Sequence, residues 1–160
     1  MSRFVCVLGA ALLIVTSASA AVITRSAMTA TYKLTLHVGP VEAMYTQAEV
    51  KAKHPASGEV MVGNSMAMGG MSMGAASRHL EVHVASRATG KVVTNVTPMI
   101  MLTDTTAMAM AEKVDAMAME GIGAGVADLH YGDNVKLAAG HVYKVVVTVK
   151  GEKATFSFKA

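Results

Sequence analysis

Polar and apolar residues alternate along several short stretches of the chain, and turn-forming residues separate these stretches. The clearest alternation covers residues 32–38 and stops at the Gly-Pro pair 39–40. A second covers residues 79–86, and a turn at 88–90 separates it from residues 91–102, which are rich in Val, Thr and Ile. Such alternation over about four to eight residues is typical of a β-strand with one buried face. We therefore expect three strands here.

The end of the sequence predicts a hairpin. Residues 141–150 are strongly β-branched, residues 153–159 alternate, and Gly151 and Glu152 form a tight two-residue connection between them. The chain has no internal repeat at a period of about 20 to 50 residues and no long helical period. Short strands joined by short turns favour an all-β fold, an immunoglobulin-like antiparallel β-sandwich.

Residues 105–125 have a mixed pattern. They contain many helix-forming residues, which favours a helix. Their methionines, however, come at positions i and i+2, and in a strand this spacing places them on one face. We expect two short strands or an irregular connection here, with a helix as the alternative.

The first twenty residues have the pattern of a cleaved secretory signal. Arg3 precedes an apolar run over residues 4–15, and small residues follow at 17–20 with an A-x-A ending. A membrane anchor is the alternative, but the run is shorter than the roughly 20 residues that a spanning helix needs. We expect residues 1–20 to be removed and residues 21–160 to form a single periplasmic domain.

Composition excludes several function classes. The one cysteine, Cys6, lies in the expected signal, so the mature domain has no thiol for a disulfide, a thiolate metal site or a nucleophile. The chain has 14 Lys and Arg against 11 Asp and Glu, and the basic residues are spread singly, which argues against nucleic-acid binding. The sequence contains no phosphate-loop or H-E-x-x-H motif and no cysteine nucleophile in the mature domain, so we do not expect an enzyme.

Methionine is the unusual residue, with 14 copies against three Phe, four Tyr and no Trp. Met99 and Met101 lie among Ile and Leu and are expected to pack in the core. A loop at about 61–76 holds a second group among Gly, Ala, Ser and Asn, which offer no apolar partners; its members are Met66, Met68, Met71 and Met73. Thioethers are soft ligands that prefer Cu(I), so this loop is either a metal-binding segment or a disordered linker.

Histidines and a carboxylate supply the other candidate ligands. In a strand, His79, Glu81 and His83 share one face at spacings of about 6.7 Å, so His79 and Glu81 can reach one ion together. His83 lies about 13 Å from His79 by the same rise and is expected to lie outside that site. A solvated sheet surface is the alternative for this face. His130, expected in a loop before a strand, adds a further imidazole.

These segments together resemble a known family. The stretches "HLEVHV", the Met117/Met119 pair, "LHYGDNVKL" and "YKVVVTV" occur in the order of H-L-E, M-P-M, H-Y-G-x-N-[VI]-K and Y-K-[VL]-[TS] in the periplasmic iron-transport proteins found beside bacterial high-affinity iron permeases. The resemblance implies an immunoglobulin-like sandwich, usually dimeric, that binds Cu(II) and serves iron uptake with an inner-membrane permease. The ligands it implies are His79, Glu81, Met119 and His130, with Met117 as the alternative thioether.

Two functions are therefore expected. The first is a periplasmic metal-binding protein that buffers copper or iron, or delivers the ion to a membrane transport system; the donor set tolerates Cu(I), Cu(II) and Fe(II). In this hypothesis the Met-rich loop is a tethered arm whose sulfurs cover a copper ion held by the strand at His79. The second is a non-catalytic protein-interaction module with an adaptable Met-rich surface.

Overall fold

The structure is a computed structural model that describes residues 21–63 and 78–160. The expected signal segment, residues 1–20, lies outside the described residues. So do Met66, Met68, Met71 and Met73 of the Met-rich loop. The structure therefore bears on the strands and on the histidines, and not on these two predictions.

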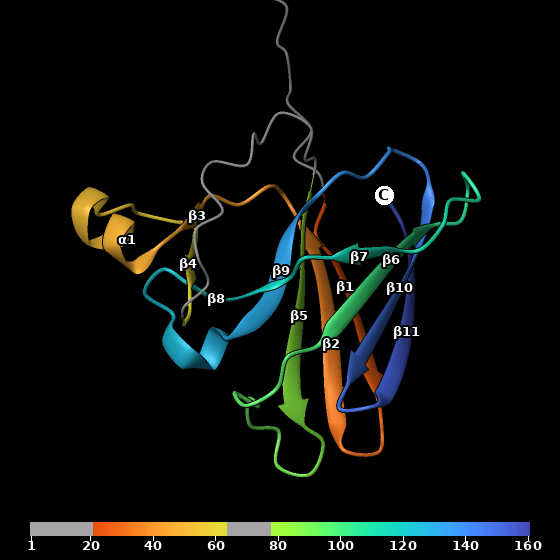
Figure 1. Ribbon diagram of the computed structural model, residues 1–160, viewed down its shortest axis with the longest axis horizontal. Coiled ribbons are helices and arrows are strands. Elements are labelled where there is room, and N and C mark those ends of the chain that lie inside the picture. Colours follow the sequence, from red (N-terminus) through yellow and green to blue (C-terminus); the bar gives the residue numbers. More distant parts are fainter. Residues whose placement is uncertain (1–20, 64–77) are drawn as a thin grey trace, which may run out of the picture.

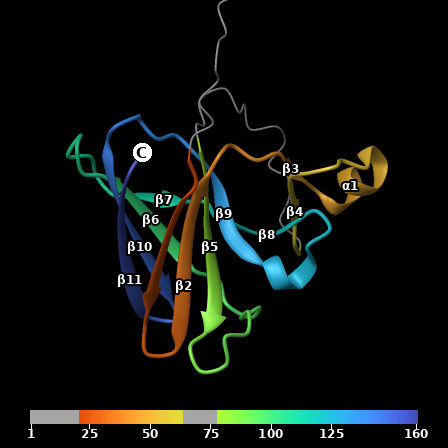
Figure 2. The same cartoon turned by 180° about the vertical axis from the view of Figure 1, so that it is seen from behind.

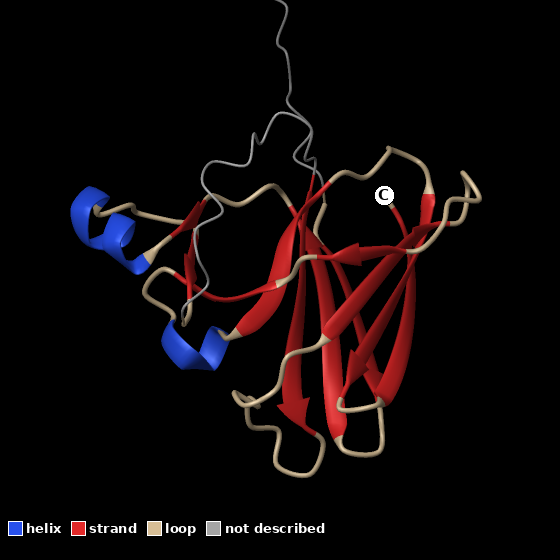
Figure 3. Cartoon of the chain, viewed as in Figure 1, coloured by secondary structure: helices blue, strands red, loops and turns tan. Residues whose placement is uncertain are grey.

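The described chain forms two β-sheets that pack face to face (Figures 1 and 3). One sheet has seven strands in the order β1 (Ile23–Met28), β2 (Tyr32–Gly39), β5 (Arg78–Ser86), β9 (His130–Val135), β8 (Met117–Gly121), β4 (Glu59–Met61) and β3 (Met44–Tyr45). The other has four, in the order β11 (Glu152–Lys159), β10 (Val142–Val149), β6 (Met99–Asp104) and β7 (Glu112–Val114). All of these pairs are antiparallel except β3 with β4. The expected all-β antiparallel sandwich is confirmed.

The core lies between the two sheets and follows the alternation of the sequence. Leu34, Leu36 and Val38 of β2 and Leu80, Val82 and Val84 of β5 are buried, and the residues between them, Thr35, His37, Glu81 and His83, are polar. The four-stranded sheet supplies the opposing side chains in the same way, and Tyr143 stacks on Phe158 with ring centroids 5.7 Å apart. The main core side chains are Leu34, Leu36, Val38, Leu80, Val82, Val84, Val145, Val147, Val149, Phe156 and Phe158.

The β10–β11 hairpin confirms the strongest strand prediction and moves its turn by one residue. Val149 pairs with Glu152, so the connection is Lys150 and Gly151 rather than Gly151 and Glu152. Both connecting residues have positive φ angles, 45° and 87°. This is the type I′ conformation that matches the twist of a two-residue hairpin, and Gly at its second position adopts it without strain.

The expected strand over residues 91–102 is wrong in its first part. Strand β6 begins only at Met99, and the segment before it makes one isolated bridge, Ala85 with Val92. Val96 is buried in the core from this irregular segment. The apolar residues that precede β6 therefore belong to a partly buried loop and not to a paired strand.

Met99 and Met101 do not fill the core, which corrects a second expectation. Met99 is 46% exposed and Met101 is half-buried, whereas Ile100 between them is fully buried. Adjacent residues of a strand point to opposite faces, so Ile100 and the two methionines beside it cannot all face the core. Ile100, with its branched side chain, faces the core.

Residues 105–125 contain two short strands, β7 and β8, as one of the expectations had it, and the helical alternative is wrong. Helices in the described residues are limited to α1 (Gln47–Lys53) and the 3₁₀ helix η2 (Gly125–Asp128). A capping box starts α1, because Thr46 and Glu49 satisfy each other's backbone N–H groups. Neither of these helices is long and apolar enough to cross a membrane.

Strands β3, β4 and β8, with α1, form a lobe at one side of the molecule (Figures 1 and 2). In both views this lobe lies away from β10 and β11, beyond the region where the two sheets face each other. The seven-stranded sheet thus has one face that packs on the core and a second face that is turned away from the core. His37 of β2, Glu81 of β5 and His130 of β9 point to that face.

Candidate metal centre

Strand register gathers the polar side chains of the seven-stranded sheet into neighbouring rows. Residues directly opposite each other in antiparallel strands point to the same side of the sheet. One row runs His83, His130, Met119 and Met61, and the next runs His37, Glu81, Gly132 and Met117. His79 and Asn134 form a third pair beside them. The expected ligands from β5, β8 and β9 therefore share one face.

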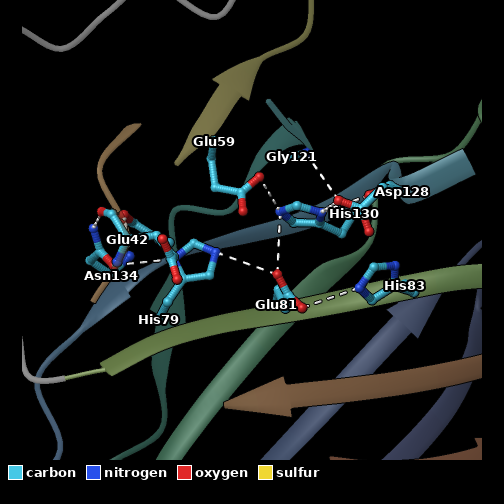
Figure 4. Close-up of polar contacts among 10 residues, drawn as sticks. Glu42, Glu59, His79, Glu81, His83, Gly121, Asp128, His130 and Asn134 are labelled. Atoms are coloured by element: carbon cyan, nitrogen blue, oxygen red, sulfur yellow. Dashed lines mark hydrogen bonds and ion pairs between the residues drawn. The ribbon is translucent and has the colours of Figure 1, made fainter. Parts of the chain in front are cut away.

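Two buried histidines converge on two carboxylates in this face (Figure 4). The Nε2 atom of His130 lies 3.3 Å from Oε2 of Glu59 and 3.4 Å from Oε2 of Glu81. The Nε2 atom of His79 lies 3.7 Å from the same Glu81 oxygen. The side chains of His79 and His130 are only 3% and 1% exposed. We call His79, Glu81, His130 and Glu59 the inner cluster.

The second nitrogen of each inner histidine fixes its tautomer. Nδ1 of His130 lies 2.8 Å from the backbone carbonyl oxygen of Asp128, which can only accept, so Nδ1 carries the proton. The amide of Asn134 accepts from Glu42 N–H through Oδ1 and donates to Glu42 C=O through Nδ2, so its oxygen faces Nδ1 of His79 at 3.1 Å. When either ring is neutral, its lone pair is therefore on Nε2, facing the carboxylates. Metal-binding histidines are held by partners of this kind.

Three buried polar atoms of the inner cluster have no hydrogen-bond partner among residues 21–63 and 78–160. They are Oε2 of Glu59, Nε2 of His79 and Nε2 of His130. Buried polar groups are almost always paired, and lone pairs that face each other repel. Burial also lowers the pKa of His79, although Asn134 and Glu81 pull it up, and the lower pKa favours the neutral ring. One donor atom from each of His79, Glu81 and His130 lies within 4.8 Å of the other two, so a cation between them would satisfy both unpaired imidazole nitrogens. Imidazole with carboxylate is a donor set for copper, zinc or iron.

The Glu59 carboxyl gives a pH-dependent prediction for the metal-free protein. Burial raises its pKa above the ordinary value of 4.5, more strongly than His130 lowers it. The folded state then holds its proton to higher pH than the unfolded state, so this group makes stability fall as pH rises from 4.5 through the raised pKa. We expect Glu59→Gln to gain stability relative to the unmodified chain between pH 4.5 and 7 in the presence of a chelator.

Urea unfolding at several pH values measures this difference. Glu112→Gln, which replaces an exposed carboxylate on β7, is the matched control and should track the unmodified chain. If the free energy of unfolding changed with pH in the same way for Glu59→Gln and the unmodified chain, the raised pKa of the Glu59 carboxyl would be contradicted.

His83 and His37 lie on the other side of Glu81. Nε2 of His83 is 3.2 Å from Oε1 of Glu81, and the His37 and His83 ring centroids are 5.2 Å apart. Burial by itself would raise the pKa of Glu81, but the His83 hydrogen bond and the nearby His130 and His79 rings lower it overall, so this carboxylate is ionised. His83 was expected to lie apart from His79, and the two indeed contact different oxygens of the carboxylate between them.

Methionine side chains border the inner cluster. Met119 is fully buried and lies opposite His130 on the neighbouring strand, with Met61 opposite it in turn. Met117 lies opposite Gly132 in the row of Glu81. The two rows therefore pass from imidazole and carboxylate to thioether across β9 and β8. These thioethers are candidate soft donors for Cu(I).

Gly132 provides the space in which the cluster forms. A Cβ atom at this position would collide with the carbonyl oxygen of Leu80 and lie 2.9 Å from Cα of Glu81. Only glycine therefore allows β9 to approach β5 this closely at the level of Glu81. The contact fixes the distance between His130 and Glu81.

A pocket of about 200 Å³ leads from solvent to the inner cluster. It is lined by Val22, His37, Gly39, Pro40, Glu42, Glu59, His79, Glu81 and Asp128. Four of these side chains are carboxylates, and none of these lining residues is a lysine or arginine. Clustered carboxylates in a cleft attract cations from solvent.

Sequence reasoning did not find Glu59, His37 or Asn134. His37 occupies a polar position of a clearly alternating stretch. The side of the sheet on which it lies was therefore predictable, but its position opposite Glu81 was not. Asn134 is part of the H-Y-G-x-N motif, which is the signal that could have singled it out. Glu59 carries no local signal, because it meets His130 only through the pairing of β4 with β8.

Asn134 also gives a prediction about copper affinity. Asn134→Ala removes the acceptor that holds His79 in its metal-binding tautomer, and loss of such a partner weakens metal binding by about 10- to 100-fold. We expect a loss of about tenfold, measured by copper titration against a competing chelator. Asn95→Ala, at an exposed loop position, should leave the affinity unchanged. Equal affinities for the two variants would contradict the positioning role.

The structure is therefore an all-β sandwich with a buried cluster of histidines and carboxylates on one sheet. Two solved structures share this fold. Uropathogenic Escherichia coli FetP, as isolated after expression in the E. coli periplasm, is 13% identical over 88% of this chain and 97% of that chain, with a TM-score of 0.58. A copper-bound FetP variant with glutamine in place of a glutamate is 12% identical over 88% of this chain and 92% of that chain, with a TM-score of 0.56. No family model and no curated protein matches the sequence.

Proposed function

We propose that this chain is a non-catalytic, periplasmic copper-binding protein that buffers the ion or delivers it to a membrane transport system. The observation that carries the proposal is that the buried, unpaired Nε2 atoms of His79 and His130 meet the Glu81 carboxylate, with one donor atom of each residue within 4.8 Å of the other two. One cation satisfies both nitrogens, whereas without a cation each remains a desolvated polar atom. The copper-bound state of a FetP variant with the same fold supports the choice of metal.

The donor set favours copper over iron. Imidazole, carboxylate and thioether groups together bind Cu(II) through the first two and Cu(I) through the last. We propose iron as a second ion that the protein binds, since Fe(II) accepts the same imidazole and carboxylate ligands. An inner-membrane permease as recipient and a homodimer as the working form belong to the proposal on the strength of the sequence resemblance.

A competition titration tests the choice of metal. At neutral pH, Cu(II) is expected to bind with micromolar or tighter affinity and to displace Fe(II), because affinities for divalent ions rise from iron to copper in such sites. Isothermal titration of the chain without residues 1–20, with Fe(II) measured under anaerobic conditions, gives both values. Absence of copper binding would overturn the proposed function, and tighter Fe(II) binding would assign the site to iron.

A further inference from the structure

The two oxygens of Glu81 contact different imidazoles (Figure 4). Oε2 lies 3.7 Å from Nε2 of His79 and 3.4 Å from Nε2 of His130. Oε1 instead accepts a hydrogen bond from Nε2 of His83 at 3.2 Å. One carboxylate therefore contacts both an inner and an outer group of histidines, which adjoin where the His83 and His130 ring centroids lie 5.2 Å apart. A carboxylate arranged in this way can bind one cation through each oxygen.

His37 completes the outer group. It lies directly opposite Glu81 in the pairing of β2 with β5. One donor atom from each of His37, Glu81 and His83 lies within 4.8 Å of the other two, and the same holds for His79, Glu81 and His130. Nδ1 of His37 lies 3.0 Å from Oγ1 of Thr24, a contact that orients the ring. The outer group thus has the same composition as the inner one, two imidazoles and one carboxylate.

The two groups differ in exposure. The His83 side chain is 25% exposed, against 3% for His79 and 1% for His130. His37 is half-buried and lines the pocket that leads to Glu81 and Glu59. The outer group is therefore more accessible to solvent than the inner cluster, and the pocket is lined by His37 of the one and by His79 and Glu59 of the other.

We propose that His37, His83 and Oε1 of Glu81 form a second Cu(II) position, bridged by Glu81 to the ion in the inner cluster. This inference rests on the proposed copper site, because both positions share Glu81. Two imidazoles and a carboxylate suit Cu(II). The ion takes the place of the proton between His83 and Glu81, and that proton is released to solvent. The outer position is the more exposed of the two, and the inner one holds its ion out of water.

Copper stoichiometry and electron paramagnetic resonance test this second position. The chain without residues 1–20 is loaded with a Cu(II) salt, freed of excess metal by gel filtration and analysed for copper. The unmodified chain should retain one more Cu(II) per chain than His37→Ala. The spectrum of the unmodified chain should show dipolar broadening at two equivalents that is absent at one equivalent. His54→Asn, which removes an exposed imidazole outside both groups, should behave as the unmodified chain.

The outcomes separate this inference from the proposed function. Equal copper content in His37→Ala and the unmodified chain, or a spectrum at two equivalents without dipolar broadening, overturns the second position. If one tightly held copper is found and is lost in the His79→Ala, His130→Ala double variant, the proposed function stands alone. No bound copper in the unmodified chain overturns both. The spectrum of the unmodified chain decides the question even if His37→Ala does not fold.

Discussion

Copper binding is expected to fall by more than about 100-fold when His79 and His130 are both replaced by alanine. These residues supply the two buried Nε2 lone pairs of the inner cluster, and each is held by a hydrogen bond at its other nitrogen. Replacing a ligand should exceed the roughly 10- to 100-fold loss that follows from replacing a residue that only supports a ligand. Titration of Cu(II) against a chelator of known affinity measures the change.

His54→Asn is the matched control for the histidine variant. His54 ends α1 with a φ of 47°, a left-handed conformation that Asn also tolerates, so the change removes an imidazole with little effect on the backbone. Its copper affinity should equal that of the unmodified chain. Circular dichroism of the double variant establishes that the sheets are intact. Unchanged affinity in a folded double variant would place the copper elsewhere in the chain.

Gly132→Ala is expected to destabilise the fold by about 2 kcal/mol and to weaken copper binding. The added methyl group meets the backbone of β5 at Leu80 and Glu81, which cannot move aside as a flexible side chain can. Strand β9 must shift, and His130 moves with it. Urea unfolding gives the change in the free energy of unfolding, and the same titration gives the affinity.

Gly39→Ala provides the comparison within the same sheet. Gly39 ends β2, and a Cβ atom there would meet no heavy atom of the described residues within 4 Å. Its stability should change by no more than about 0.5 kcal/mol. If both glycine variants lost a similar amount of stability, the loss of glycine itself, and not the close approach of β9 to β5, would explain the destabilisation.

Alternation along single strands is what made the fold and part of the site predictable. In β5 the pattern that places Leu80 in the core also places His79 and Glu81 together on the opposite face. The β10–β11 hairpin was predictable for the same reason, since both strands are long and their turn is short. These features depend on residues that are close in sequence.

Features that depend on distant pairings were not predictable. Strand β1 is mostly exposed at the edge of its sheet and shows no clear alternation, so its sequence carries no strand signal. Glu59 enters the inner cluster only because Met61 pairs with Met119, far along the chain. His130 was expected in a loop but begins β9, and this strand position is what aligns it with His83.

Strand β5 carries core and ligands on its two faces, and this links folding quality to copper content. If β5 slipped by one residue against β2 and β9, its aliphatic side chains would exchange places with His79, Glu81 and His83. A molecule with this register shift would expose the aliphatic face of β5 and bury its ionisable groups. It would also lose its proposed copper ligands. The fraction of a preparation that takes up copper should therefore report how much of it has reached the native state.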